Sequence, residues 1–147
     1  MDKICTSLVQ SYKLLELKFD ASTADMCWAT GLLGESFPDW KVLCMSPEEY
    51  KNIESKWTAV PAWSLPALTE LVMNKIKSSW YTDTKLEFYR AKPINKSKYD
   101  HYVCYSFRRV SYETTRVYQD GLCTGMHGEL LDAMFELVCL MRKESLL

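Results

Sequence analysis

The chain has 147 residues, a length that fits one domain and leaves little room for two independent hydrophobic cores. Hydrophobic residues make up 48% of the sequence and charged residues 25%, so wholesale disorder is excluded. With 18 basic and 19 acidic residues the formal net charge is −1, which excludes a protein that is basic throughout.

The N-terminal sequence lacks the basic and then apolar order of a signal peptide, and the most apolar run, residues 130–141, is interrupted by two carboxylates. We therefore expect a cytoplasmic protein that does not contact a membrane. The six cysteines are widely spaced and most lie among apolar residues. They predict no zinc site, and we expect reduced thiols that pack as small hydrophobic side chains.

The first predicted element is an amphipathic helix over residues 7–18. Ser7 and Gln10 have the spacing of a capping box, in which two side chains satisfy unpaired backbone N–H groups at the helix start. The face expected to be buried is formed by apolar residues at helical spacing, namely Leu8, Tyr12, Leu15 and Phe19.

Two strands and two helices are predicted next. Residues 23–30 and 40–45 predict strands on either side of a loop that contains two glycines and one proline. Helices are predicted after Ser46 and after Ser64, because serine is a favoured N-cap, and the second helix should end near residue 77. Trp63 precedes that second cap and is expected to pack back onto Leu68 as a hydrophobic staple, with ligand stacking as the alternative.

The second half of the chain predicts an antiparallel meander and a final helix. The strands are expected at residues 85–90, 99–108 and 114–119, the hairpin loops at 92–98 and 109–113, a turn at Asp120-Gly121, and the helix at about 129–144. Runs of strands with segregated helices indicate an α+β fold. We expect one domain over residues 1–147, with a mainly antiparallel sheet of about five strands packed on one face by about three helices.

Three segments, taken in order, carry a resemblance that covers most of the chain. They are Met1–Thr6 with Ala24–Trp28, the segment Val60–Leu68 with its Pro-Ala-Trp-Ser-Leu helix start, and Leu131–Val138 with its Asp-Ala-x-Phe-Glu helix. Together they resemble a group of small, uncharacterised proteins encoded in bacteriophage and prophage genomes of gut bacteria. Met134 departs from the alanine that is usual there. The resemblance implies a phage or mobile-element origin and a cytoplasmic setting in a bacterial host cell, but no activity and no catalytic residues.

Few residues could carry catalysis. Cys123 and His127 are close in sequence and are the one candidate thiol–imidazole dyad, with an ordinary cysteine beside a solvated loop histidine as the structural alternative. Asp132 and Glu136 are expected on the solvated face of the last helix. No phosphate-binding loop, dinucleotide motif or metal-ligand spacing is present, so we expect neither cofactor nor metal and favour a protein that is not an enzyme.

Charge is unevenly distributed along the chain. Residues 75–118 contain ten basic and four acidic residues, a balance of +6, and they hold ten of the nineteen aromatic residues. Exposed rings between cations on a sheet can stack on bases and contact phosphates. The candidate binding residues are Tyr89, Arg90, Tyr102, Arg108, Arg109, Arg116 and Trp63.

Three functions remain open at this point. The first, which we favour, is a non-enzymatic phage accessory protein that binds a protein partner, with self-association as a homodimer included. The second is nucleic-acid or nucleotide binding through the basic, tyrosine-rich sheet of residues 75–118. The third is a small enzyme with a cysteine–histidine or carboxylate site.

Overall fold

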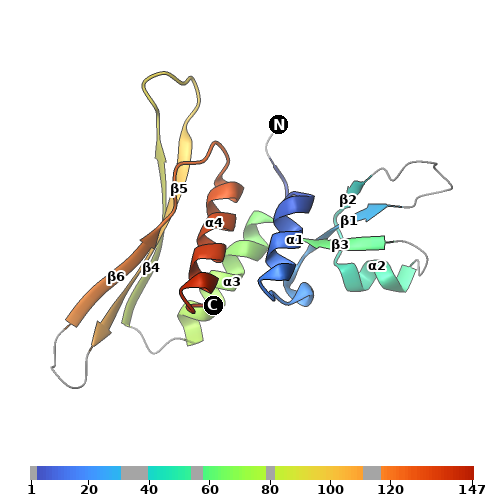
Figure 1. The fold of residues 1–147 in the computed structure, drawn as a ribbon, viewed down its shortest axis with the longest axis horizontal. Helices are drawn as coiled ribbons and strands as arrows, with labels where there is room; N and C mark the ends of the chain where they lie inside the picture. The colour runs from blue at the N-terminus through green and yellow to red at the C-terminus, as the bar shows by residue number, and fades with distance from the viewer. Residues whose placement is uncertain (1–2, 31–39, 54–57, 79–81, 111–116) are drawn as a thin grey trace. The chain divides into compact units, whose positions relative to one another are not determined.

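The computed structural model describes residues 3–30, 40–53, 58–78, 82–110 and 117–147 (Figure 1). The elements in chain order are α1 (Leu8–Glu16), η1 (Ala21–Thr23), β1 (Met26–Thr30), β2 (Lys41–Leu43), α2 (Pro47–Ile53), β3 (Thr58–Ala62), α3 (Leu65–Ser78), β4 (Thr82–Ala91), β5 (Asp100–Val110), β6 (Val117–Cys123) and α4 (Leu130–Lys143). The chain divides into two compact units, Lys3–Leu68 and Thr69–Leu147. No helix within the described ranges is both long enough and apolar enough to cross a bilayer.

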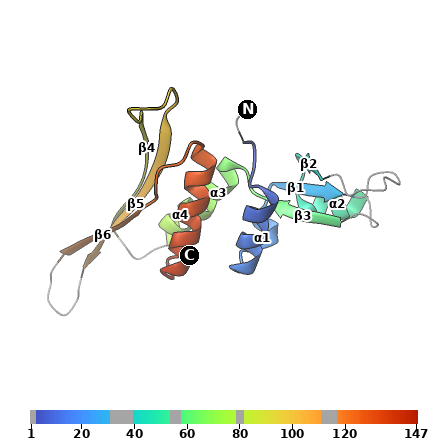
Figure 2. The same cartoon turned by 45° about the horizontal axis from the view of Figure 1, so that its top comes forward.

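The first unit is built on an antiparallel sheet with the strand order β2-β1-β3 (Figure 2). The central strand β1 is buried on both faces. Cys27 and Ala29 pack with Tyr50 of α2 on one face, whereas Met26 packs with Ala62 of β3 on the other. Burial on both sides explains why this strand is almost entirely apolar.

The sequence analysis assigns no strand to residues 58–62, where the structure has β3 with Pro61 inside it. Proline cannot donate to a sheet ladder and is confined to strand edges. In the structure Pro61 lies opposite Cys27 in an edge strand that pairs with β1 alone among the described strands, the kind of strand in which proline is tolerated.

Helix α1 begins as predicted but buries a different face. The Ser7 hydroxyl accepts from the Gln10 N–H at 3.2 Å, and the Gln10 side chain accepts from the Ser7 N–H at 2.9 Å. Tyr12, expected in the core, is 52% exposed, whereas Ser11 is fully buried. The Ser11 hydroxyl shares a 2.8 Å hydrogen bond with Thr6, which explains how a polar side chain is accommodated there.

Trp63 is fully buried in the first unit, so the alternative in which its ring stacks on a ligand is wrong. Its indole N–H donates to the Thr23 hydroxyl at 2.9 Å, and its backbone N–H donates to Thr6 Oγ1 at 3.1 Å. These bonds satisfy both polar groups of a large core residue, whereas the expected staple of Trp63 onto Leu68 stays a prediction.

Ser64 caps α3, as predicted. Its hydroxyl accepts from the Ala67 N–H at 3.3 Å and donates to the Asp25 carboxylate, which also accepts from the Ser64 backbone N–H at 2.9 Å. The start of α3 is therefore joined by hydrogen bonds to the segment that precedes β1.

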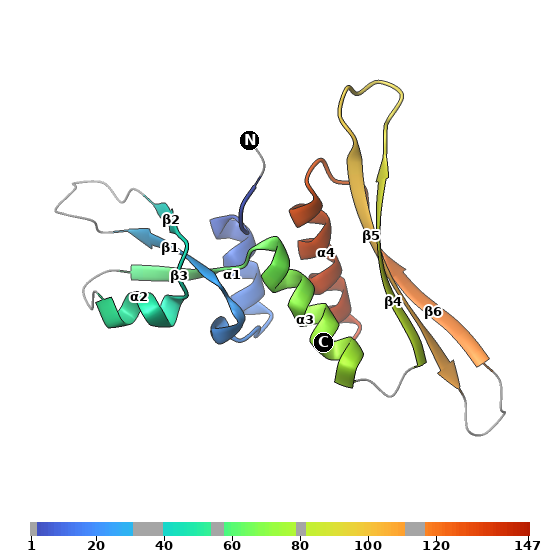
Figure 3. The same ribbon diagram turned by 180° about the vertical axis from the view of Figure 1, so that it is seen from behind.

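The second unit contains an antiparallel sheet with the order β4-β5-β6, and α4 packs on β5 and β6 (Figure 3). The predicted alternation of β5 is confirmed, since Val103, Tyr105 and Phe107 are buried and the intervening residues are more exposed. The buried stripe of α4 is formed by Leu131, Ala133, Met134, Leu137, Val138 and Met141.

The α+β class and the antiparallel pairing are confirmed. The six described strands form two sheets of three, in place of one sheet of about five. The turn predicted at Asp120-Gly121 is wrong, because both residues lie within β6 opposite Phe107 and Ser106. Glycine is needed there for close approach, since a Cβ on Gly121 would lie 3.0 Å from the Tyr105 carbonyl oxygen.

Candidate functional site

The most distinctive surface of the second unit is the end of the β4–β5 hairpin, residues Phe88–Tyr99, which we call the hairpin arm. Its twelve residues include four basic side chains and no acidic one. It also carries four of the nine exposed large hydrophobic side chains among the described residues, namely Phe88 at 48%, Tyr89 at 39%, Ile94 at 102% and Tyr99 at 46%. Figures 1 and 3 show the hairpin extending past the end of α4.

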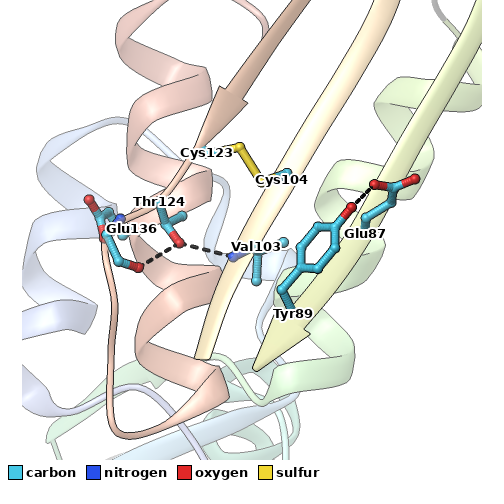
Figure 4. Close-up of a disulfide and its surroundings, with 8 residues drawn as sticks. Glu87, Tyr89, Val103, Cys104, Cys123, Thr124 and Glu136 are labelled. Carbon is cyan, nitrogen blue, oxygen red and sulfur yellow. Dashed lines mark hydrogen bonds between the residues drawn. A yellow bond between two sulfur atoms is a disulfide. The ribbon is translucent and has the colours of Figure 1, made fainter. Parts of the chain in front are cut away.

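On one face of the hairpin, a tyrosine of the arm stacks on a tyrosine just beyond it. Tyr89 of β4 lies directly opposite Tyr102 of β5, and their rings are nearly parallel, at 11°, with centroids 4.9 Å apart. The Tyr89 hydroxyl donates to the Glu87 carboxylate (Figure 4). That hydrogen bond to the Glu87 carboxylate raises the pKa of the Tyr89 phenol.

The opposite face of the arm carries Phe88 and Arg90, because neighbouring residues of a strand point to opposite sides. The Arg90 guanidinium lies 4.9 Å from the centre of the Tyr99 ring, a cation–π contact across the hairpin. Each face of this two-stranded ribbon therefore presents exposed aromatic surface.

The remaining cations of the arm, Lys92, Lys96 and Lys98, lie in the connection between the strands, and all three are exposed. Lys96 forms a 3.1 Å ion pair with Asp100, whose side chain is only 10% exposed. The two carboxylates beside the arm each have a partner in the hairpin: Asp100 pairs with Lys96, and Glu87 accepts from the Tyr89 hydroxyl. The surface that faces solvent is predominantly positive.

Of the candidate binding residues, Tyr89 and Arg90 lie in the arm on opposite faces, and Tyr102 lies just beyond it, stacked on Tyr89. Arg108 shares the Tyr102 face but lies six residues along β5, roughly 20 Å away, so it does not join them. The side chain of Arg109 and the whole of Arg116 lie outside the described part of the structure.

Sequence reasoning missed Phe88, Ile94 and Tyr99 as exposed members of this surface. It predicted residues 92–98 only as a hairpin loop. The available signal was an apolar side chain, Ile94, within a short connection that also holds three lysines, Lys92, Lys96 and Lys98.

Cys104 and Cys123 form a disulfide between β5 and β6, on the sheet face away from the buried side (Figure 4). They are directly opposite in the ladder, with Cα atoms 4.2 Å apart, close to the spacing of a non-hydrogen-bonded antiparallel pair. The prediction of reduced thiols is therefore wrong for these two cysteines. Because its sulfur is bonded to Cys104, Cys123 has no thiolate, and the Cys123–His127 dyad does not form.

His127 pairs instead with Glu136 of α4, through Nε2 and Oε2. The same Glu136 oxygen accepts from the Gly125 N–H at 3.2 Å, so the expectation of a purely solvated carboxylate is wrong. On its other side the connection is joined to β5, because His127 and His101 exchange backbone hydrogen bonds of 2.8 and 2.6 Å. We assign His127 and Glu136 a structural role in fastening the segment between β6 and α4.

The other four cysteines form no disulfide; they are Cys5, Cys27, Cys44 and Cys139, and all of them lie in the described ranges. Burial, with a smaller contribution from Asp25, raises the pKa of the Cys5 thiol to about 11. Burial also raises the pKa of Cys27. Neither is a nucleophile near neutral pH, because the thiolate is the reactive form.

No group of three or more histidine, cysteine, aspartate or glutamate residues within the described ranges is placed to hold a metal ion. A pocket of about 350 Å³ in the first unit is lined by Ala21, Ser22, Ser46, Pro47 and Glu48, a set with one carboxylate and no nucleophile other than serine hydroxyls. The hairpin arm therefore remains the strongest candidate for function. Comparisons with protein-family models, curated proteins and solved structures find no match to this chain.

Proposed function

We propose that this protein binds nucleic acid through the hairpin arm. The observation that carries the proposal is the Arg90–Tyr99 stack beside three exposed lysines, in a segment without any carboxylate. Lysine and arginine contacts to phosphates supply most of the affinity in non-specific nucleic-acid binding, and exposed rings add base stacking.

The composition of the arm favours nucleic acid over the protein partner that the sequence analysis favoured. The core of a protein–protein interface is depleted in lysine. In the arm, the exposed apolar residues do not form one uninterrupted patch, because Arg90 and Lys92 separate Tyr89 from Ile94. Alternating cations and rings fit a polyanion whose bases offer flat apolar faces.

The aromatic residues add contacts that phosphate binding alone does not need. Tyr89 and Tyr99 each expose more than a third of their surface on opposite faces of the ribbon. Stacking of one base on an aromatic ring is worth about 1–3 kcal/mol, so either ring could raise affinity by roughly tenfold or more.

The test is fluorescence anisotropy with labelled single-stranded and double-stranded DNA over a range of salt concentrations. If about three of the four cations of the arm reach phosphates, the slope of log K against log salt should be about −2 to −3. Replacing Lys92 and Lys98 together by glutamine should reduce the magnitude of that slope by about 2.

The matched control is the double variant Lys41→Gln and Lys143→Gln, which changes net charge equally at two exposed lysines outside the arm. It should bind as the unmodified protein does. Equal losses in both double variants would show a general charge effect and contradict the arm as the site. Absence of binding at low salt would remove the proposed function and return the protein-partner reading to first place.

A further inference from the structure

The tip of the hairpin arm carries an apolar side chain that the fold does not use. Ile94 is 102% exposed and therefore makes no packing contact that shields it from water. It follows Pro93, and the Lys96 N–H donates to the Pro93 carbonyl at 3.2 Å, which closes the turn on which Ile94 lies. Ile94 therefore lies at the turn, with Lys92 two residues before it and Lys96 two residues after it.

We infer that the ligand of the arm is double-stranded DNA and that Ile94 inserts between neighbouring base pairs as a wedge that bends the duplex. This inference rests on the proposed function and names the ligand class of the same site. Proteins that insert an apolar side chain at a base step from the minor groove partly unstack that step and kink the duplex by about 20–90°.

The two-faced arrangement of the arm supports entry into a groove. Tyr89 lies on one face of the ribbon and Arg90 on the other, so a flat surface could use only one of them. A groove has two walls lined by phosphates, and known β-ribbon and β-sheet proteins place strands in the minor groove as well as in the major groove. Lysines on both sides of the tip are then placed to contact phosphates that flank the wedged step.

The chemistry of the Ile94 side chain favours double-stranded over single-stranded DNA as the ligand. An aliphatic side chain has no ring face for base stacking, so a single strand gains little from it. Between two unstacked base pairs, the same side chain loses most of its contact with water, and this burial is favourable. The exposure of an isoleucine at the tip is therefore better explained by a duplex.

The experiment measures binding and bending separately. A short duplex with donor and acceptor dyes at its two ends reports bending by energy transfer, and anisotropy reports affinity. The test variant is Ile94→Ala, and the matched control is Val9→Ala, because Val9 is an aliphatic residue that is 79% exposed in the first unit. Both side chains are exposed, so neither substitution should affect folding.

The unmodified protein and the Val9→Ala control should raise energy transfer on binding and prefer a duplex with a central mismatch, where unstacking costs less. Ile94→Ala should still bind, about tenfold more weakly to the mismatched duplex, but without the rise in energy transfer. Binding without bending by the unmodified protein, or unchanged bending by Ile94→Ala, would overturn the wedge and leave the proposed function intact. Failure to bind any nucleic acid would instead remove both.

Discussion

Removing the disulfide between Cys104 and Cys123 should destabilise the second unit measurably. The two cysteines are 19 positions apart, and the bond closes a loop that includes most of the β5–β6 hairpin. In the chain-entropy description, a crosslink of this span restricts the unfolded chain and stabilises the folded state by about 3 kcal/mol. The whole stability of a domain is commonly about 5–15 kcal/mol, so this is a large fraction.

The measurement is urea unfolding of the oxidised protein, the same protein in a phosphine reductant, and the double variant Cys104→Ser and Cys123→Ser. Reduction and double substitution should lower the urea concentration at the midpoint of unfolding by similar amounts. In thermal unfolding, each should lower the melting temperature by about 10 °C. The reductant should not change the double variant further. Cys44→Ser is the matched control, since Cys44 is exposed and forms no disulfide.

Thiol titration gives an independent check on the same bond. The unreduced protein should expose four reactive thiols when denatured, and six after reduction, because four of the six cysteines form no disulfide. Six thiols without reduction, or identical unfolding midpoints with and without reductant, would refute the reasoning.

Three further outcomes follow from local contacts. Ser7→Ala removes the acceptor for a backbone N–H of α1 and should lower the free energy of unfolding by about 1 kcal/mol in urea; no change would contradict the cap. Glu136→Ala removes the acceptor for the Gly125 N–H, whose hydrogen exchange should accelerate relative to buried amides of α4; equal exchange would contradict the bond. Stability should fall as pH rises from about 9 towards about 11, because the unfolded chain releases the Cys5 proton near 9.0 while the folded chain holds it to about 11. Cys5→Ala should flatten that fall in urea titrations at several pH values, and an unchanged pH profile would refute the assignment.

The features predicted correctly from sequence are those fixed by neighbouring residues. The Ser7–Gln10 capping box and the Ser64 cap each involve residues within one helical turn, and the alternation of β5 is a property of one strand. Such contacts depend on backbone geometry that the local sequence specifies.

The features missed depend on pairing between distant segments. The Cys104–Cys123 bond requires β5 and β6 to pair in one particular register, which cysteine spacing does not reveal. Pro61 lies in a strand only because that strand is an edge, and Glu136 meets His127 only because the segment before α4 folds back over it. In each case the structure depends on how segments pair or pack in the folded chain, which the local sequence does not specify.

The charge pattern predicted a cationic, aromatic segment but placed it across one broad sheet face. In the structure Arg108 is far along β5 from the arm, and Arg90 lies on the face opposite Tyr102. The proposed surface is therefore a ribbon with two faces and a tip, with Tyr89 and Tyr102 on one face and Arg90 and Tyr99 on the other. This geometry changes what the candidate residues can do, because cations on both sides of a ribbon can contact two rows of phosphates at once.

The base of the arm is held more firmly than its end. Three contacts fasten the start of β5. His101 exchanges backbone hydrogen bonds with His127, the Val103 N–H donates to the Thr124 hydroxyl, and Cys104 forms the disulfide with Cys123. Beyond this point the contacts reported for the arm lie within the β4–β5 hairpin: the strand pairing, the Lys96–Asp100 ion pair and the Arg90–Tyr99 contact. A fixed base reduces the conformational entropy that the arm would lose in the proposed binding, so the disulfide and the His127 segment, although remote from the tip, would support the proposed affinity.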